Sequence, residues 1–495
     1  MSSLMTTQEG PSKRRQKAGL LVAPALAGLI YLIPFPNLPG NAHLLAAILT
    51  WVVVSWITEA IPLAITSLLG AAFCVAAGLG SVKTVFSHFA HPIIFLFIGS
   101  FFLAEAFVAH KVDQRFAVWL LSLKWVNAKP AGLFLAMGLA TALLSMWISN
   151  TAAVAIMVPM ALSILSTLRQ GDMPLPYESG VMLLLAYGAA AGGIATMIGT
   201  PPNLIGVGLL AEQAGIELSF FEWFSIGFPL TCAMFLLVYG VLMWLHPPPH
   251  AFPALSGHIR TVGGEQGAWT RGQRNTCLAL GLAIGGWIGP GLLAIVLGRD
   301  AEIVIFLNAR FPKELVPIFA AGLLFVLPIN FKAGEFTLTW AQAKNINWGT
   351  ILLFGGGLVF GHLMVETGLA KIFGQGLVDV FGVQTLWGLT AVAIGAALLL
   401  TEIASNTASA SMLVPVVIAI AQAADVSPIP PTMGVCLAAS LAFVLPVSTP
   451  PNAIVYGTGL VPIQHMLRAG ILLDIIGAVL VWITLWLLCP LLGLV

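Results

Sequence analysis

Residues 146–159 have the sequence MWISNTAAVAIMVP, and residues 401–416 have the sequence TEIASNTASASMLVPV. Each stretch carries a Ser-Asn-Thr tripeptide, centred on Asn150 or Asn406, between two apolar segments. Ser, Asn and Thr are favoured at helix N-termini because their side-chain oxygens accept hydrogen bonds from unpaired backbone N–H groups. Each tripeptide therefore predicts a short polar turn followed by a new helix.

Two further apolar segments are interrupted by a double proline. They are MIGTPPNLIG at 197–206 and LPVSTPPNAIVYGTG at 445–459. A double proline cannot continue a helix, but proline is favoured in a first helical turn. Each motif predicts a broken helix whose second part begins at the prolines.

The composition is that of an integral membrane protein. The 495 residues include only 39 charged side chains (20 Lys and Arg, 19 Asp and Glu), or 8%, and 59% are hydrophobic. The mean hydropathy is +0.99. Soluble domains are about 25% charged. The near-zero net charge of +1 gives no indication of a nucleic-acid partner. Irregular backbone at membrane depth is tolerated only inside protein or beside a cavity, so the four motifs are expected inside the protein.

The motifs recur in the same order in both halves of the chain. Ser149 and Ser405 are 256 positions apart, and Pro201 and Pro450 are 249 apart. This spacing predicts a duplication of about 250 residues, inverted if each half crosses the membrane five times. The expected fold is an all-α polytopic membrane protein with about 11 transmembrane helices plus two re-entrant hairpins. The expected parts are 1–42 (tail and first span), 43–246 (repeat 1), 247–275 (cytoplasmic connection) and 276–495 (repeat 2).

The basic residues predict the orientation. With a cytoplasmic N-terminus, fifteen of the twenty Lys and Arg residues fall on the cytoplasmic side. The five expected outside are Lys83, Arg299, Arg310, Lys313 and Lys371. We therefore expect a multi-pass protein of the cell (inner or plasma) membrane with a cytoplasmic N-terminus.

The four motifs are suited to ions. Helix N-termini present N–H donors and partial positive charge to an anion, while backbone carbonyls and hydroxyls suit a hard cation such as Na⁺. None of the motifs contains Lys, Arg or His. A buried dianion would lack a protein counter-charge there, so co-bound Na⁺ is expected to supply it.

Other polar residues are weaker candidates. Glu59, Glu105 and Glu366 lie in or near apolar segments, and Glu402 precedes its Ser-Asn-Thr by three residues, which favours a structural role in the hairpin. His91 and His362 are most simply explained as packed, hydrogen-bonded side chains. The five cysteines lack CxxC spacing, so no disulfide framework or zinc site is expected from them.

The four motifs resemble those of the divalent anion/sodium symporter family, and the resemblance extends over about residues 19–489. It implies a homodimer with a scaffold and a moving transport domain, working by an elevator motion on dicarboxylates, citrate or sulfate. Carried over by motif, the implied Na⁺ ligands are Ser145, Ser149, Asn150 and Gly199 at one site and Thr401, Ala404, Asn406 and Ser448 at the other. The implied substrate-binding residues are Asn150, Thr151, Thr200, Asn406, Thr407, Thr449 and Pro450.

The expected function is therefore Na⁺-coupled symport of a small divalent anion. The most favoured substrates are C4 dicarboxylates such as succinate, malate or fumarate. The alternatives are a dicarboxylate or tricarboxylate exchanger and a carrier of an inorganic anion such as sulfate. An enzyme is not expected, because no HExxH or GxSxG motif occurs. A channel would not need two inverted halves with hairpin tips.

Overall fold

The computed structural model describes residues 13–36, 38–123, 126, 130–168, 175–248, 267–381 and 385–495. This part of the chain is mostly helical, as expected. It departs from an all-α fold in one small antiparallel ribbon, β1 (Pro328–Asn330) paired with β2 (Glu335–Phe336). Of the expected cytoplasmic connection, residues 249–266 lie outside the described residues.

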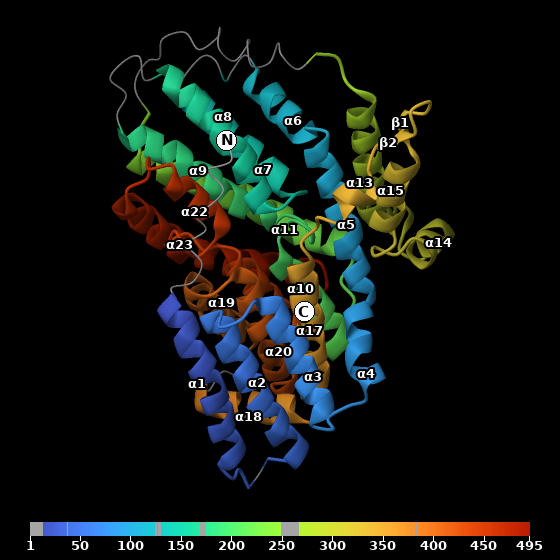
Figure 1. The fold of residues 1–495 in the computed structure, drawn as a ribbon, viewed down its shortest axis with the longest axis vertical. Coiled ribbons are helices and arrows are strands. Elements are labelled where there is room, and N and C mark those ends of the chain that lie inside the picture. Colours follow the sequence, from blue (N-terminus) through green and yellow to red (C-terminus); the bar gives the residue numbers. More distant parts are fainter. Residues whose placement is uncertain are drawn as a thin grey trace.

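One set of helices is built from the segments before each Ser-Asn-Thr hairpin, and we call it the outer group. Within it, α17 packs on α3 and α15 packs on α5, and Figure 1 shows α1–α3 and α13–α15 as two separate bundles. The members are α1 (Lys13–Leu32), α2 (Gly40–Thr58), α3 (Leu63–Ala76), α4 (Val82–Ser87), η1 (His88–Ala90), α5 (Pro92–Ala109), α13 (Arg271–Leu297), α14 (Glu302–Arg310), α15 (Val316–Val326), α16 (Trp340–Ala343) and α17 (Trp348–Glu366).

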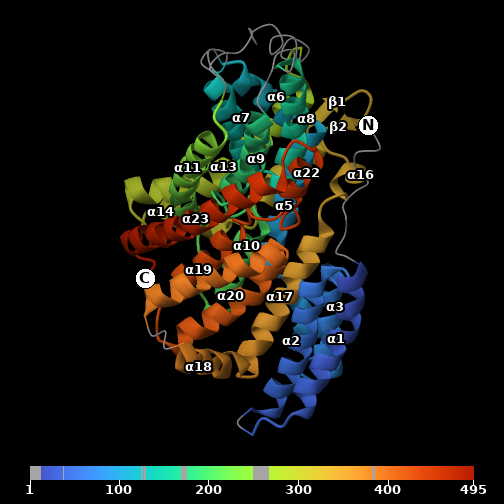
Figure 2. The same cartoon turned by 90° about the vertical axis from the view of Figure 1, so that its left-hand side faces the viewer.

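The other set contains all four motifs, and we call it the motif group. Its helices are α7 (Pro130–Ser145), α8 (Asn150–Leu168), α9 (Leu175–Gly193), α10 (Pro201–Ala214), α11 (Phe220–Leu245), α19 (Leu386–Ile403), α20 (Asn406–Ala423), α21 (Ile429–Ala439), α22 (Pro450–Gly457) and α23 (Ile463–Leu491). Two helices connect the groups: α6 (Val112–Leu121) precedes α7, and α18 (Leu369–Phe381) lies along α20. Figure 2 shows α17 passing between α3 and the α19–α20 hairpin.

The outer surface of the molecule is apolar. Large aliphatic side chains point outward on α13, α19 and α23, where Val296 is 78% exposed, Leu399 77% and Leu491 78%. Such a surface is stable against lipid and not against water. By length and composition, eight helices in the described part of the chain could each cross a membrane, among them α2, α11 and α17. The fold is therefore that of a multi-pass membrane protein.

Matching contacts recur within the motif group. In the first half, α7 and α8 both pack on α9. In the second half, the corresponding helices α19 and α20 both pack on α21. The two halves also interlock, because α10 lies against α20 and α22 lies against α8. The helix after each proline motif is thus held by the hairpin of the other half.

Candidate functional site

The first Ser-Asn-Thr forms the tip of the α7–α8 hairpin. Helix α7 ends at Ser145 and α8 begins at Asn150. The Ser149 hydroxyl accepts a hydrogen bond from the Ala152 backbone N–H at 3.3 Å, so it caps α8 as predicted. The buried Ser145 hydroxyl donates to Asn150 Oδ1 at 2.7 Å. Two neutral oxygen atoms therefore face each other at the tip.

The first proline motif leaves a non-helical link between α9, which ends at Gly193, and α10, which begins at Pro201. Asn203 holds this link. Its buried Nδ2 donates to the Gly193 carbonyl oxygen at 3.1 Å and to the Thr196 carbonyl oxygen at 2.8 Å. The link is therefore irregular in its backbone but fixed by side-chain hydrogen bonds.

The hairpin tip rests directly on this link. The Thr196 hydroxyl donates to the Met146 carbonyl oxygen at 2.6 Å. A Cβ atom added to Gly193 would lie 2.4 Å from Asn150 Oδ1, so only glycine allows the contact. One added to Gly199 would lie 2.4 Å from the Gly193 carbonyl oxygen. The structure thus brings together Ser145, Asn150 and Gly199, three of the implied ligands of one Na⁺ site.

The second hairpin tip repeats the contact between a hydroxyl and the asparagine Oδ1, but it lacks the predicted cap, because the Ser405 side chain makes no capping hydrogen bond to α20. Helix α20 begins at Asn406. The buried Thr401 Oγ1 lies 2.8 Å from Asn406 Oδ1 and 2.7 Å from the Ala439 carbonyl oxygen. Of these three oxygen atoms only the Thr401 hydroxyl carries a proton, so the other two cannot donate to one another. Such a group of oxygen acceptors favours a cation as the common partner. The implied ligand Ala404 is the buried C-cap residue of α19 at this tip.

The second proline motif is held as the first one is. Asn452 Nδ2 donates to the Ala442 and Leu445 carbonyl oxygens at 2.9 and 3.1 Å. The residues before the two double prolines also share one extended conformation, with φ −145° and ψ 142° at Thr200 and φ −140° and ψ 148° at Thr449.

The halves differ at Glu402. Its carboxylate accepts hydrogen bonds from the backbone N–H groups of Val444 and Leu445, both at 3.1 Å, and from the Ser448 hydroxyl at 2.8 Å. This agrees with the structural role expected for Glu402. The Ser448 hydroxyl thereby donates its proton and keeps its oxygen lone pairs, as the Ser145 hydroxyl does at the first tip. Met146, 256 positions earlier, offers no such side chain.

The substrate-facing candidates have unused donors. Within the described residues, the hydroxyls of Thr151 and Thr407 and the Nδ2 amides of Asn150 and Asn406 make no hydrogen bond to protein, and all four side chains are half-buried. Thr200 is buried, Thr449 accepts a hydrogen bond from the Asn452 N–H at 3.3 Å, and Pro450 is exposed.

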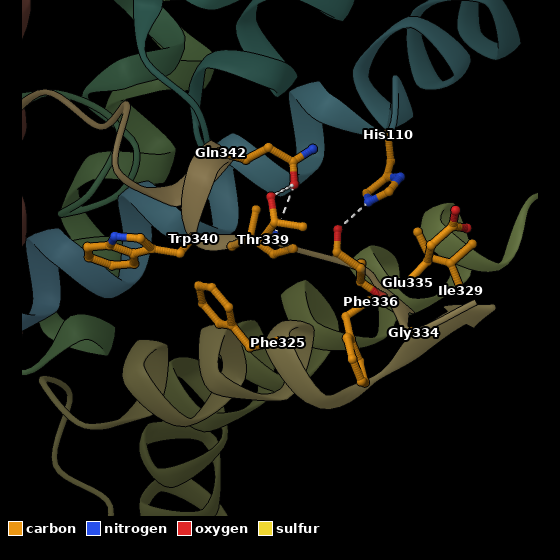
Figure 3. A pocket seen from close by; sticks show the side chains of 11 residues that line it. His110, Phe325, Ile329, Gly334, Glu335, Phe336, Thr339, Trp340 and Gln342 are labelled. Atoms are coloured by element: carbon orange, nitrogen blue, oxygen red, sulfur yellow. Dashed lines mark hydrogen bonds between the residues drawn. The ribbon is translucent and has the colours of Figure 1, made fainter. Parts of the chain in front are cut away.

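A cavity of about 460 Å³ lies elsewhere, where α15, the β1–β2 ribbon and α16 face the end of α5. Figure 3 shows His110 directed at the ribbon, where its Nε2 lies 2.6 Å from the Thr337 carbonyl oxygen, and Thr339 beside Gln342, its capping partner. The polar groups that line this cavity are thus largely hydrogen-bonded to one another. None of the predicted site residues lines this cavity.

Asn203 and Asn452 were missed as functional residues in the sequence. The signal was present, because each is the asparagine of a Pro-Pro-Asn motif. Their partners lie seven and ten residues earlier, in the non-helical link or at its start, and this distance is not encoded in the motif.

Comparisons with known proteins show the family of the chain. The family model described as the sodium:sulfate symporter transmembrane region matches residues 14–495. The sodium-dependent dicarboxylate transporter SdcS of Staphylococcus saprophyticus is 33% identical over 487 residues, which is 96% of this chain and 92% of the relative. The SdcS of Staphylococcus aureus is 32% identical over 496 residues, covering 97% and 92% of the two chains.

Solved structures share the fold at low sequence identity. The YdaH transporter of Alcanivorax borkumensis aligns with a TM-score of 0.55 and 14% identity, over 84% of this chain and 88% of that one. MtrF of Neisseria gonorrhoeae aligns with a TM-score of 0.55 and 11% identity, over 93% and 96%. The family match over nearly the whole length, the SdcS relatives and the paired motifs lead to one conclusion: the chain belongs to the divalent anion/sodium symporter family.

Proposed function

We propose that this protein is a Na⁺-coupled symporter that imports small dicarboxylates, C4 acids such as succinate, malate and fumarate first, across the cell membrane. Sodium-dependent dicarboxylate transport is supported by two relatives that are described as such transporters and that match this chain over 92% of their own length. The observation that carries the proposal is the duplicated oxygen cluster, Ser145 with Asn150 and Thr401 with Asn406.

The two clusters are the proposed Na⁺ sites. Na⁺ is a hard cation that prefers oxygen ligands, and uncharged oxygens hold it without trapping it. One site would combine Ser145, Ser149, Asn150 and the Gly199 carbonyl. The other would combine Thr401, Ala404, Asn406 and the backbone at Ser448. The Gly193 and Ala439 carbonyls lie beside these clusters and would add further ligands.

The substrate would bind between the cation sites and solvent. Each asparagine has Oδ1 in an oxygen cluster and Nδ2 without a protein partner, so one side chain can serve a cation and a carboxylate at once. The Thr151 and Thr407 hydroxyls add a donor on each side, with Thr200, Thr449 and Pro450 nearby in the sequence motifs. Two Na⁺ ions would balance the charge of a dianion that meets no basic side chain in the motifs.

The resemblance supports an elevator motion of two inverted repeats, and the matched contacts support the repeat itself. The motif group would carry substrate and Na⁺, and the outer group would stay in the membrane as the scaffold of a homodimer. The interlocked packing of α10 on α20 and α22 on α8 supports movement of the motif group as one body.

Uptake into proteoliposomes tests the proposal. We expect accumulation of labelled succinate only with an inward Na⁺ gradient, with choline replacing Na⁺ as the matched condition. Citrate and sulfate are offered in parallel. Undiminished uptake without Na⁺, dependent on internal dicarboxylate, would instead establish an exchanger. Na⁺-driven uptake of sulfate without succinate would establish an inorganic anion carrier. Asn150→Ala protein controls for leakage.

A further inference from the structure

A second polar cluster lies where α10 meets the outer group, and it contains none of the residues assigned above. Glu212 projects from α10, His88 belongs to η1, and His362 belongs to α17. Glu212 Oε1 lies 3.2 Å from His88 Nε2 and 3.0 Å from His362 Nδ1. One ligand atom from each of the three residues falls within 4.8 Å of the others. From this geometry we infer a binding site for a divalent transition-metal ion such as Zn²⁺ that bridges the motif group and the outer group.

The distances suit such an ion. Zn²⁺ binds imidazole nitrogen and carboxylate oxygen at about 2.0–2.2 Å in tetrahedral geometry, which places neighbouring ligand atoms about 3.3 Å apart. The 3.0 and 3.2 Å separations in the cluster are close to that value. Two histidines and one carboxylate form a frequent zinc ligand set, with the fourth position left for water.

The surrounding hydrogen bonds orient the ligands. His88 Nδ1 lies 3.0 Å from the Thr84 carbonyl oxygen and can donate to it, which leaves the Nε2 lone pair directed at the site. His362 Nε2 lies 3.5 Å from Glu366 Oε2, and a carboxylate behind a ligating histidine is the usual outer-shell partner.

His91 completes the surroundings without being a ligand. Its Nδ1 accepts a hydrogen bond from the Ile93 N–H at 3.4 Å, so its proton is on Nε2, which faces Glu212 Oε2 at 3.7 Å. Two further carboxylates, Glu217 and Glu314, are held by Lys313 at 3.4 and 3.5 Å, which offsets part of their charge.

The position of the site gives it a mechanical consequence. Helix α10 packs on α17, where Gly361 faces the Leu209 and Gln213 side chains. A metal ion held by Glu212 on one side and His88 and His362 on the other would join the two groups. If the groups slide during transport, which rests on the proposed function, the bound metal would arrest transport with the groups in this relative position.

Binding is tested on the purified full-length protein, independently of transport. We expect saturable 1:1 binding of Zn²⁺ by calorimetry in chelator-free buffer, and a rise in melting temperature that EDTA reverses. His88→Ala, His362→Ala and Glu212→Gln should each weaken binding by about 100-fold or more, and Glu366→Gln by about 10-fold, as expected for an outer-shell partner. His43→Ala should leave the affinity unchanged, because the His43 Nε2 lies 2.6 Å from the Ile30 carbonyl oxygen and His43 is not one of the three ligands. Wild-type protein without Zn²⁺ affinity, or unchanged affinity in a His88→Ala, His362→Ala double variant, would overturn the site.

A transport assay separates the site from its consequence. Zn²⁺ should inhibit Na⁺-driven uptake by wild-type protein, EDTA should restore it, and His362→Ala protein should transport in both conditions. That variant also shows that the substitution leaves the fold intact. Binding lost in the cluster variants together with uptake that Zn²⁺ never slows would support the metal site and refute the sliding of α10 past α17. If the protein binds no Zn²⁺ and only a change of pH alters uptake, the cluster binds protons and the metal site is overturned.

Discussion

Replacing Asn203 with alanine should loosen the non-helical link that carries Gly199. Asn203 is fully buried, and its Nδ2 is the side-chain donor to both the Gly193 and Thr196 carbonyls. The substitution leaves the Gly193 carbonyl without that donor, whereas the Thr196 carbonyl still accepts the Gly199 N–H at 3.4 Å. At about 1–3 kcal/mol for an unsatisfied buried group and about 0.5–1.5 kcal/mol for an ordinary hydrogen bond, the loss of stability should be about 1.5–4.5 kcal/mol. This is a large share of the about 5–15 kcal/mol by which folded proteins are typically stable.

The measurements are scanning fluorimetry in detergent and Na⁺ activation of succinate uptake. Asn203→Ala should lower the melting temperature and shift Na⁺ activation to higher concentration, because the Gly199 carbonyl is a proposed ligand. Asn452→Ala should behave alike, since the Asn452 Nδ2 also donates to the carbonyls ten and seven residues earlier.

Asn275→Ala is the matched control. Its Nδ2 also approaches two acceptors, Thr337 Oγ1 at 2.7 Å and the Pro328 carbonyl at 3.4 Å, but it is half-buried and belongs to the outer group. It should cost about 0.5–1.5 kcal/mol, the net value of an ordinary hydrogen bond, and leave Na⁺ activation unchanged. Wild-type stability and Na⁺ activation in both Asn203→Ala and Asn452→Ala would refute the reasoning.

Four further predictions concern the site and the topology. Thr151→Val and Thr407→Val keep the side-chain shape and remove only the hydroxyl, so the KM for succinate should rise more than the Na⁺ requirement; normal kinetics in both would make the tripeptides helix caps alone. Thr401→Val removes one oxygen of the second cluster and should raise the Na⁺ concentration for half-maximal uptake, with an unchanged Na⁺ curve counting against that site. Uptake should fall as pH drops through the second pKa of the substrate, about 5–6, because the dianion is bound; a flat profile with succinate would contradict this. Impermeant labelling of a cysteine added at each end should mark the end after Val495 from outside only, whereas labelling of both ends from one side would refute the inverted repeat.

Local chemistry explains what could be predicted from the sequence. Apolar content far above that of soluble proteins requires a lipid environment, wherever each segment packs. Helices α8 and α20 begin at Asn150 and Asn406, and α10 and α22 begin at Pro201 and Pro450, as the motifs predicted. These boundaries depend on proline geometry and, at Ser149 and Thr449, on capping side chains within a few residues, so the sequence alone determined them.

The tertiary structure decided which groups meet across long separations. Glu402 lies 42 and 43 positions from the backbone N–H groups it binds, and no periodicity of the sequence encodes that contact. The Glu212 cluster is the strongest case, because its histidines are 124 and 150 positions from Glu212. Neither His362 nor Glu212 belongs to a metal-ligand motif along the chain. Hydrogen bonds and ligand sets of this kind depend on distances of about 3 Å between separate helices, and only the packing of α10 against α17 and η1 sets those distances.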